Sequence, residues 1–294
     1  MTHPRRSLLF MPGSNARALE KARILAADCI ILDIEDSVAP DAKALARDQI
    51  AKAIAAGGFG RREIWIRTNA PDTPFWADDV KMAAKAKPHA ILVPKVSSID
   101  DIRTIKNALS EANADPSIRV WAMIETARAV LHAEELAAAS RDVEPRLSGF
   151  VFGPNDISRE TRIRMQPGRA IMLPMITHCI LATRAYGLEI LDGPYSDFSN
   201  VDGFNLECTQ ARDLGFDGKT LIHPGQIDAC NVIFTPPTAE VERARKIIAA
   251  FELPENAARG AISLDGQMVE RLHADMARRT IALADSIAAM AKSP

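Results

Sequence analysis

Two carboxylates of this chain come directly after apolar segments. Glu125 follows RVWAMI, and Asp156 follows GFVFGPN. A pair of carboxylates, completed by water and substrate oxygens, is a common way for proteins to hold Mg²⁺. The sequence has no spaced His pair or Cys cluster that would favour a softer metal. Each residue also has a simpler interpretation, since Glu125 could be a first-turn helix carboxylate and Asp156 a helix cap. Because both follow consecutive apolar segments, we favour a shared Mg²⁺ site.

An arginine and three acids end two earlier apolar segments. Arg67 ends EIWIR, and Asp33, Glu35 and Asp36 end CIILDIED. The planar guanidinium suits a substrate carboxylate or a developing enolate oxygen. A salt bridge from Arg67 to Glu35 or Asp36 is the alternative, and both roles could coexist. Because side chains alternate along a strand, Asp33 and Glu35 share one face, where they could position Arg67 or bind metal waters. Asp36 is equally compatible with a turn or a cap.

Other charged residues near segment ends have weaker signals. Lys95 ends the fourth segment and could form a Schiff base, but the paired carboxylates favour the metal route. Lys21 on the first helix is by default a solvated charge, and His223 a packed strand-end histidine. Asp192 ends the seventh segment. A polar, basic stretch over 159–169 is interpreted as a loop over the site, whose arginines could meet phosphates or only solvent: Arg162, Arg164 and Arg169.

Eight short apolar segments alternate with helical stretches and must position these groups. They are SLLFM (7–11), CIILDIE (29–35), EIWIRT (63–68), AILVPK (90–95), RVWAMIE (119–125), LSGFVFG (147–153), LEILDGP (188–194) and GKTLIH (218–223). Near-continuous apolar runs are typical of parallel strands covered on both faces. The pattern predicts an α/β (β/α)8 TIM barrel with its functional groups at the C-terminal ends of the strands. A doubly wound sheet is disfavoured because PGSN after the first segment is not a GxGxxG turn.

The pattern changes after TPP at 235–237. We predict a barrel domain over 1–235 and a C-terminal helical extension over 236–294, with helices at 238–251 and about 267–291. Such an extension can pack on its own barrel or contribute to a neighbouring subunit's site.

Composition excludes several other classes of protein. The chain has 294 residues, 47% of them hydrophobic and 25% charged, with a net charge of −2. This balance gives no basic footprint for nucleic acid, and no apolar stretch approaches the roughly 20 residues of a membrane span. The four cysteines are scattered, and the basic N-terminus has too short an apolar run for a signal peptide. We therefore expect a cytoplasmic enzyme.

Several segments resemble, in order and spacing, the citrate lyase beta subunit-like branch of the HpcH/HpaI aldolase superfamily, whose relatives include malyl-CoA, citramalyl-CoA and citryl-CoA lyases. The segments are RRSLLFMPGSN (5–15), LDIEDSVAPDAKALAR (32–47), IWIRTN (64–69), MIETARAV (123–130), FVFGPNDIS (150–158), LDGPYSDFSN (191–200) and GFDGKTLIHPGQI (215–227). The resemblance implies a Mg²⁺-dependent barrel lyase that forms a homotrimer or hexamer. It implies metal at Glu125 and Asp156 and substrate contact at Arg67.

The resemblance also implies coenzyme A contacts and a catalytic group in the extension. The coenzyme positions match Phe10, Lys21, Ile222 and His223, whereas Asn15 stands where some relatives have a coenzyme-contacting arginine. In acetyl-CoA-handling relatives, an aspartate at the end of a segment like GQMVE (266–270) acts on a neighbouring subunit's site, and this chain has Glu270 there. The alternative for Glu270 is a surface residue on an amphipathic helix.

The expected activity is C–C cleavage of a malyl-CoA, citramalyl-CoA or citryl-CoA type thioester to an α-keto acid and an acyl-CoA. Arg67 would stabilise the enolate oxygen, and Glu270 would protonate the enolate carbon. Three alternatives stay open: a metal-dependent aldolase acting on free hydroxy-keto acids, a malyl-CoA thioesterase in which Glu270 activates water, and a subunit of a citrate lyase complex.

Overall fold

Eight parallel strands close into a barrel in which each strand pairs with the next along the chain and β8 pairs with β1. The computed structural model describes residues 3–256 and 258–291. The strands are β1 (Ser7–Pro12), β2 (Cys29–Asp33), β3 (Glu63–Arg67), β4 (Ala90–Val93), β5 (Arg119–Ile124), β6 (Leu147–Phe152), β7 (Glu189–Asp192) and β8 (Gly218–Leu221). Each overlaps one of the apolar segments, so the predicted (β/α)8 barrel is confirmed.

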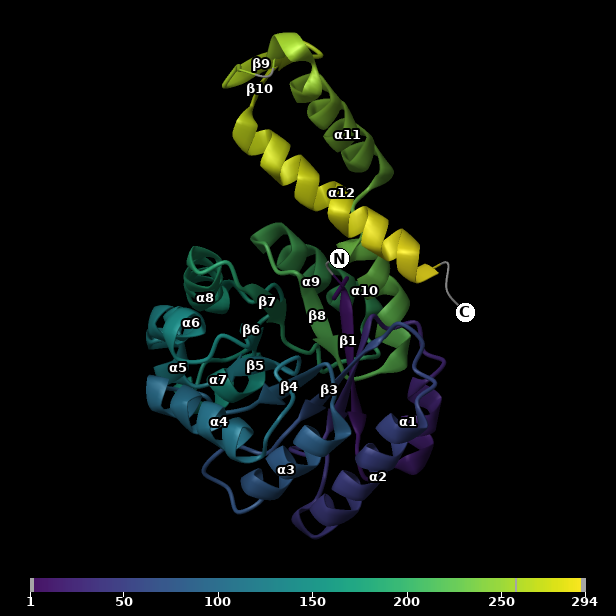
Figure 1. Cartoon of the computed structure of the whole chain (residues 1–294), viewed down its shortest axis with the longest axis vertical. Coiled ribbons are helices and arrows are strands. Elements are labelled where there is room, and N and C mark those ends of the chain that lie inside the picture. Colours follow the sequence, from purple (N-terminus) through teal and green to yellow (C-terminus); the bar gives the residue numbers. More distant parts are fainter. Residues whose placement is uncertain (1–2, 257, 292–294) are drawn as a thin grey trace. The chain divides into compact units, whose positions relative to one another are not determined.

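Helices connect the strands around the outside of the barrel (Figure 1). They are α1 (Ala16–Ala22), α2 (Lys43–Ala56), α3 (Trp76–Ala86), α4 (Ile99–Glu111), α5 (Ala127–Leu131), α6 (Ala133–Asp142), α7 (Pro154–Thr161), α8 (Leu173–Ala185), α9 (Val201–Leu214) and α10 (Ile227–Phe234), with 3-10 turns η1 (Pro40–Ala42), η2 (Ala170–Met172) and η3 (Pro224–Gln226). The predicted loop at 159–169 is shorter than expected, because α7 continues to Thr161.

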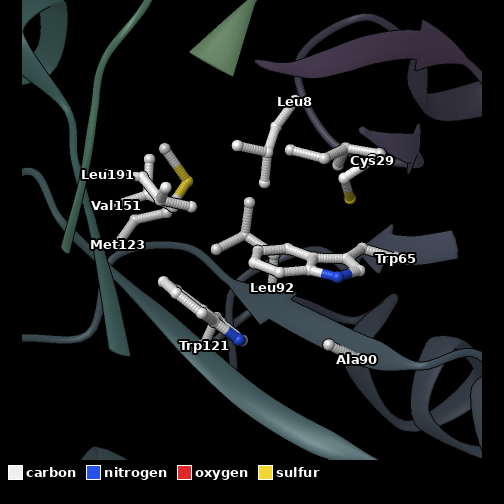
Figure 2. Close-up of a cluster of buried hydrophobic side chains, with 10 residues drawn as sticks. Leu8, Cys29, Trp65, Ala90, Leu92, Trp121, Met123, Val151 and Leu191 are labelled. Atoms are coloured by element: carbon white, nitrogen blue, oxygen red, sulfur yellow. The ribbon is translucent and has the colours of Figure 1, made fainter. Parts of the chain in front are cut away.

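Large apolar side chains fill the barrel interior. All residues of β2 and β4 are buried, as expected of strands with a packed interior on one face and helices on the other. Trp65 and Trp121 pack with ring centroids 4.6 Å apart, and Leu92 and Met123 lie beside them (Figure 2). The interior is therefore a solid core, which leaves the strand ends as the place for a site.

A charged cluster lies beside this core. Arg5 makes paired hydrogen bonds to Glu63 at 2.8 Å and to Glu189 at 2.8 and 2.9 Å. Its guanidinium also lies 5.5 Å from the Trp121 ring and 5.9 Å from the Trp65 ring. Glu63 and Glu189 are the first residues of β3 and β7, so this cluster belongs to the N-terminal end of the barrel.

The described residues from Val232 to Ala291, with Pro4 and the residue before it, form a second compact unit, while Arg5–Asn231 form the barrel unit. The division falls within α10. The second unit contains α11 (Thr238–Glu252), η4 (Pro254–Asn256), β9 (Ala261–Leu264), β10 (Gln267–Glu270) and α12 (Arg271–Ala291). Its own core is formed by Ala244, Ile247, Phe251, Ile262, Val269, Ala274 and Ala277.

The helix predicted from about 267 is wrong at its start. Asp265 and Gly266 both have positive φ, 48° and 77°, which closes an antiparallel hairpin between β9 and β10. Residues 267–270 therefore form a strand, and α12 begins at Arg271.

A membrane-crossing helix is not found within 3–256 and 258–291, since none there is both long and apolar enough.

Candidate active site

The predicted functional residues of the barrel unit follow the strands in three sectors of its C-terminal end, called the rim below. Because the strands are parallel and in sequence order, residues after adjacent strands are neighbours at the rim. The coenzyme candidates belong to β8 and β1–α1, the arginine and its acids to β2–β3, and the metal candidates to β5–β6.

Arg67, the last residue of β3, is a fixed cation. Its Nε and Nη2 donate to the two Asp33 carboxylate oxygens, both at 2.7 Å, and its guanidinium lies 4.6 Å from the Phe10 ring. Only 8% of Arg67 is exposed. Burial opposes its charge, but Asp33 and Glu35 outweigh this and raise the pKa of Arg67. The side chain is thus held rigidly and stays charged.

Asp33 orients this arginine through a dense set of hydrogen bonds. Besides Arg67, its carboxylate accepts from the backbone N–H of Glu35 at 2.9 Å and from the N–H and Oγ of Ser37. Burial alone would raise the pKa of Asp33, but Arg67 and these donors lower it. Asp33 thus holds Arg67 through two hydrogen bonds, and the expected salt-bridge contacts of Arg67 with Glu35 and Asp36 are present beside it.

Glu35 faces the same Arg67 guanidinium, but unlike Asp33 it is not hydrogen-bonded to it. Its Oε2 lies 2.7 Å from Arg67 Nη1, but the N–H is not directed at it, and this buried oxygen has no hydrogen-bond partner among the described residues. Burial raises the pKa of Glu35 to about 8, despite Arg67, with Glu125 adding to the rise. Glu35 is therefore mainly a neutral acid at pH 7. Asp36 lies 3.8 Å from Arg67 Nη1, with its side chain 69% exposed.

Glu125 and Asp156 converge on one cation, the ammonium of Lys95. Lys95 Nζ lies 2.7 Å from Asp156 Oδ1 and 3.1 Å from Glu125 Oε1, and the Lys95 N–H donates to Glu125 Oε1 at 2.7 Å. Burial lowers the pKa of Lys95, but the two carboxylates outweigh this and raise it. A protonated lysine is a poor nucleophile, so the Schiff-base alternative loses support.

The donor set fits a hard divalent cation. The Lys95 ammonium shows that a cation can be held by both carboxylates at once, and oxygen donors suit Mg²⁺, which keeps several waters. A Cβ at Gly153 would lie 2.4 Å from Glu125 Cβ and 3.0 Å from Glu125 Oε2, so the glycine makes room for this carboxylate. Among residues 3–256 and 258–291, three or more His, Cys, Asp or Glu side chains do not gather into a metal-binding group. Any Mg²⁺ here would rely on two protein carboxylates.

Neither simpler interpretation of these acids describes the structure fully. Thr126, not Glu125, caps α5 by accepting from the Ala129 N–H at 3.0 Å. Asp156 lies in the first turn of α7, whose N-cap position is Gly153, and its Oδ1 contacts Lys95 and Arg159. Glu125 is 1% exposed, and burial raises its pKa although Lys95 opposes the shift.

The coenzyme candidates lie on adjacent elements. Phe10 of β1 packs against Arg67, and Lys21 is exposed on α1. Ile222 is 42% exposed after β8. His223 is exposed rather than packed, its ring stacked on Phe198 at 4.8 Å and 14°, and its Nδ1 accepts from the Gly225 N–H.

The sequence did not reveal a buried network of ion pairs that involves residues of β7 and β8. Asp192 is wholly buried, with Oδ1 2.7 Å from Arg169 Nη1 and Oδ2 2.6 Å from Lys219 Nζ. Glu207 of α9 accepts from the same lysine at 2.8 Å. The sequence suggested that Arg169 meets phosphate or solvent, but this is wrong, because Arg169 is 1% exposed. Its contacts instead anchor the loop after α7.

Two basic residues of α2 support the rim, and spacing alone gave no sign of them. Lys43 Nζ donates to the carbonyl oxygens of Ile34 and Glu35, and Arg47 Nη1 donates to Asp79 at 2.9 Å. Asp79 in turn accepts from the backbone and side-chain nitrogens of Asn69, two residues after Arg67.

Glu270 belongs to the second unit. It is the last residue of β10, and its backbone N–H donates to His273 Nδ1 at 3.0 Å. It lies on a hairpin rather than on an amphipathic helix.

Comparison with known proteins places this geometry in a family. The HpcH/HpaI aldolase/citrate lyase family model matches residues 6–224. The chain is 46% identical over 291 residues to a (3S)-malyl-CoA thioesterase of Cereibacter sphaeroides, covering 99% of this chain and 98% of that one. It is 32% identical over 289 residues to the citrate lyase subunit beta of Escherichia coli, covering 97% and 94%.

Solved structures agree with the sequence comparison. CitE from Mycobacterium tuberculosis, in complex with magnesium, acetoacetate and coenzyme A, superposes with a TM-score of 0.73 at 27% identity, covering 95% of this chain and 97% of that one. Together with the barrel and its rim, these matches show that the chain belongs to the HpcH/HpaI aldolase/citrate lyase family.

Proposed function

We propose that this chain is a Mg²⁺-dependent enzyme that hydrolyses the thioester of a 3-carboxy-3-hydroxyacyl-CoA such as malyl-CoA. The observation that carries the proposal is the fixed Arg67 cation on the same barrel rim as a two-carboxylate cation site. The similarity to a (3S)-malyl-CoA thioesterase over nearly the whole chain supports hydrolysis as the outcome. The magnesium and coenzyme A of the CitE complex support the ligands.

The residues divide the reaction between them. Glu125 and Asp156 would hold Mg²⁺, which supplies a Lewis acid for the substrate's carboxylate and hydroxyl oxygens. Arg67 would stabilise the negative charge that develops on the thioester carbonyl oxygen as water adds to the carbonyl carbon. Glu270 of a neighbouring subunit would accept the water's proton. The C–S bond then breaks, and the departing sulfur takes the proton that Glu270 accepted, so that coenzyme A thiol and malate are the products.

Cleavage of the C–C bond is the second candidate, and Arg67 is the reason. The carbonyl oxygen that becomes negative during hydrolysis is the same atom that carries the enolate charge during cleavage, so one arginine serves both reactions. Cleavage of malyl-CoA would give glyoxylate and the enolate of acetyl-CoA, whose carbon Glu270 would protonate. The similarity to citrate lyase subunit beta favours this candidate.

A product analysis separates the two. The purified protein is incubated with Mg²⁺ and malyl-, citramalyl-, methylmalyl- or citryl-CoA, and free thiol, keto acid and acyl-CoA are measured together. Free thiol without keto acid supports hydrolysis, whereas equal amounts of keto acid and acyl-CoA support cleavage. Activity that survives both Glu125→Ala and Asp156→Ala at the wild-type rate would contradict the metal site.

Two further outcomes would replace the proposal. Retro-aldol activity on free hydroxy-keto acids, with none on thioesters, would indicate an aldolase. Inactivity alone, combined with co-purification of an acyl carrier protein, would indicate a subunit of a larger lyase.

A further inference from the structure

Lys43 occupies a position that is unfavourable for a lysine. It is the first residue of α2, where the helix dipole disfavours a cation, and it is 6% exposed. Burial lowers its pKa, although Asp33 and Glu35 oppose this shift. A buried charge at a helix N-terminus costs stability unless its surroundings compensate it, so its contacts indicate what it does.

Those contacts are to the carbonyl oxygens of two consecutive peptide units in the β2–α2 turn, the units before and after the Glu35 Cα. Lys43 Nζ donates to the Ile34 carbonyl at 2.7 Å and to the Glu35 carbonyl at 2.8 Å. The Phe75 ring centroid lies 5.5 Å from the same ammonium. The lysine therefore fixes the orientation of the peptide that joins Ile34 to Glu35.

The same turn carries the groups that hold Arg67. The Ile34 N–H donates to the Arg67 carbonyl at 2.9 Å, and the Glu35 N–H donates to Asp33 Oδ1, the oxygen that also accepts from Arg67 Nε. The Glu35 side chain faces Arg67 Nη1. A change in the Ile34–Glu35 peptide would thus move both acids that fix the guanidinium.

We propose that Lys43 is a positioning residue for the reaction, acting through the β2–α2 turn on Glu35, Asp33 and Arg67. The inference rests on the proposed function, in which Arg67 stabilises the developing oxyanion. This role explains why the segment VAPDAKALAR contains a buried lysine, although no residue of the segment is proposed to contact the reacting atoms.

The test compares the full-length wild type with Lys43→Met, using Lys52→Met, an exposed lysine of the same helix, as the matched control. With malyl-CoA and Mg²⁺, we expect Lys43→Met to lower kcat about tenfold to a hundredfold, as for other groups that orient a site. KM should stay within about threefold, because the lost interaction acts in the transition state. Lys52→Met should match the wild type.

A second readout does not depend on turnover. Amide hydrogen exchange should be faster over residues 34–38 in Lys43→Met and unchanged in Lys52→Met, since the Glu35 and Ser37 N–H groups are bonded to Asp33. If Lys43→Met fails to fold, Lys43→Gln, which retains an amide donor, should give an intermediate loss of kcat.

A folded Lys43 variant with wild-type kcat would overturn the inference, even if it were less stable, because the lysine would then be only structural. If the wild type itself does not turn over the thioester, the proposed function fails, and the exchange experiment alone decides. Unchanged exchange at 34–38 would then overturn the positioning role.

Discussion

At the scale of single residues, two cations of the rim each contact a pair of acids. Arg67 contacts Asp33 and Glu35, and Lys95 contacts Glu125 and Asp156. The position of the Arg67 guanidinium is fixed, because it donates two hydrogen bonds to Asp33. The Lys95 ammonium is a mobile point charge on a flexible stem, so a divalent cation can compete with it for the same oxygens.

Removal of the Lys95 ammonium should therefore strengthen metal binding. In Lys95→Met, Glu125 would lose its cation and Asp156 would keep only the exposed Arg159, so Mg²⁺ would relieve the repulsion between the two carboxylates. Isothermal titration of the substrate-free protein should show tighter Mg²⁺ binding than in the wild type. Lys85→Met, on α3, provides a control that leaves the affinity unchanged. Weaker binding in Lys95→Met would show that the lysine supports the metal site instead of competing for it.

The raised pKa of Glu35 gives a pH dependence with a definite sign. The folded pKa is about 8 against 4.5 for the free side chain, so the native state holds this proton after the unfolded chain has lost it. The stability due to the neutral acid is complete below about pH 4.5 and is lost as pH rises through about 8.

Relative to Glu35→Gln, the wild type should therefore lose free energy of unfolding between pH 5 and pH 8.5, because the glutamine cannot ionise. Urea denaturation at several pH values, with a metal chelator present, measures the difference. The exposed Glu111→Gln on α4 should show no such trend. A constant difference between wild type and Glu35→Gln would mean that Glu35 is ionised in the folded protein throughout.

Some residue-level features could be predicted and others could not. Side-chain alternation placed Asp33 and Glu35 on one face, and both contact Arg67. Lys95 is different, because its contact with both carboxylates depends on a left-handed backbone, with φ 58°, that the sequence does not reveal. The sequence also gives no sign that Arg169 is buried, because its partners Asp192 and Glu207 are distant in sequence.

At the scale of elements, the two ends of the barrel have different tasks. The rim carries the candidate site, whereas the N-terminal ends of β3 and β7 carry the Arg5 cluster with Glu63 and Glu189. Polar groups at that end of a TIM barrel act on stability.

Arg5→Met should destabilise the barrel by about 3 kcal/mol, because two acids lose their shared partner in a half-buried site. The loss should be smaller at pH 5 than at pH 8. Burial raises the pKa of Glu189 while Arg5 lowers it, so removal of Arg5 raises it further and favours protonation. Denaturant unfolding of Arg5→Met and of the exposed Arg17→Met measures both effects. Equal losses at the two pH values would contradict the ionic explanation.

The apolar segments predicted the strands well because parallel barrel strands are buried on both faces. Residues 267–270 were assigned to a helix because the segment is short and flanked by a strong helical pattern. The correct signal was local: Asp265-Gly266 is a preferred hairpin turn, and Ile262 and Val269 pair across it in the core of the second unit.

At the scale of the whole molecule, the barrel unit contains Arg67 and the metal candidates, and the second unit contains Glu270. Composition and periodicity could predict that two parts exist. They could not predict whether Glu270 acts at a barrel site of its own chain or of another chain, because that depends on how chains associate.

Mixing two inactive variants tests whether Glu270 acts on a neighbouring subunit. Arg67→Ala and Glu270→Ala chains, each expected to be nearly inactive alone, are co-expressed in equal amounts with the same tag and purified as a randomly mixed population of assemblies. If a site combines Arg67 of one chain with Glu270 of another, about a quarter of the sites in a mixed homo-oligomer contain both intact residues. Malyl-CoA turnover should then recover to about that fraction of the wild-type rate, since each intact site works independently. The double variant Arg67→Ala/Glu270→Ala, mixed with wild-type chains, controls for simple dilution, because it should leave the same fraction of intact sites. Mixed assemblies no more active than the separate variants would place both residues in a site formed by a single chain.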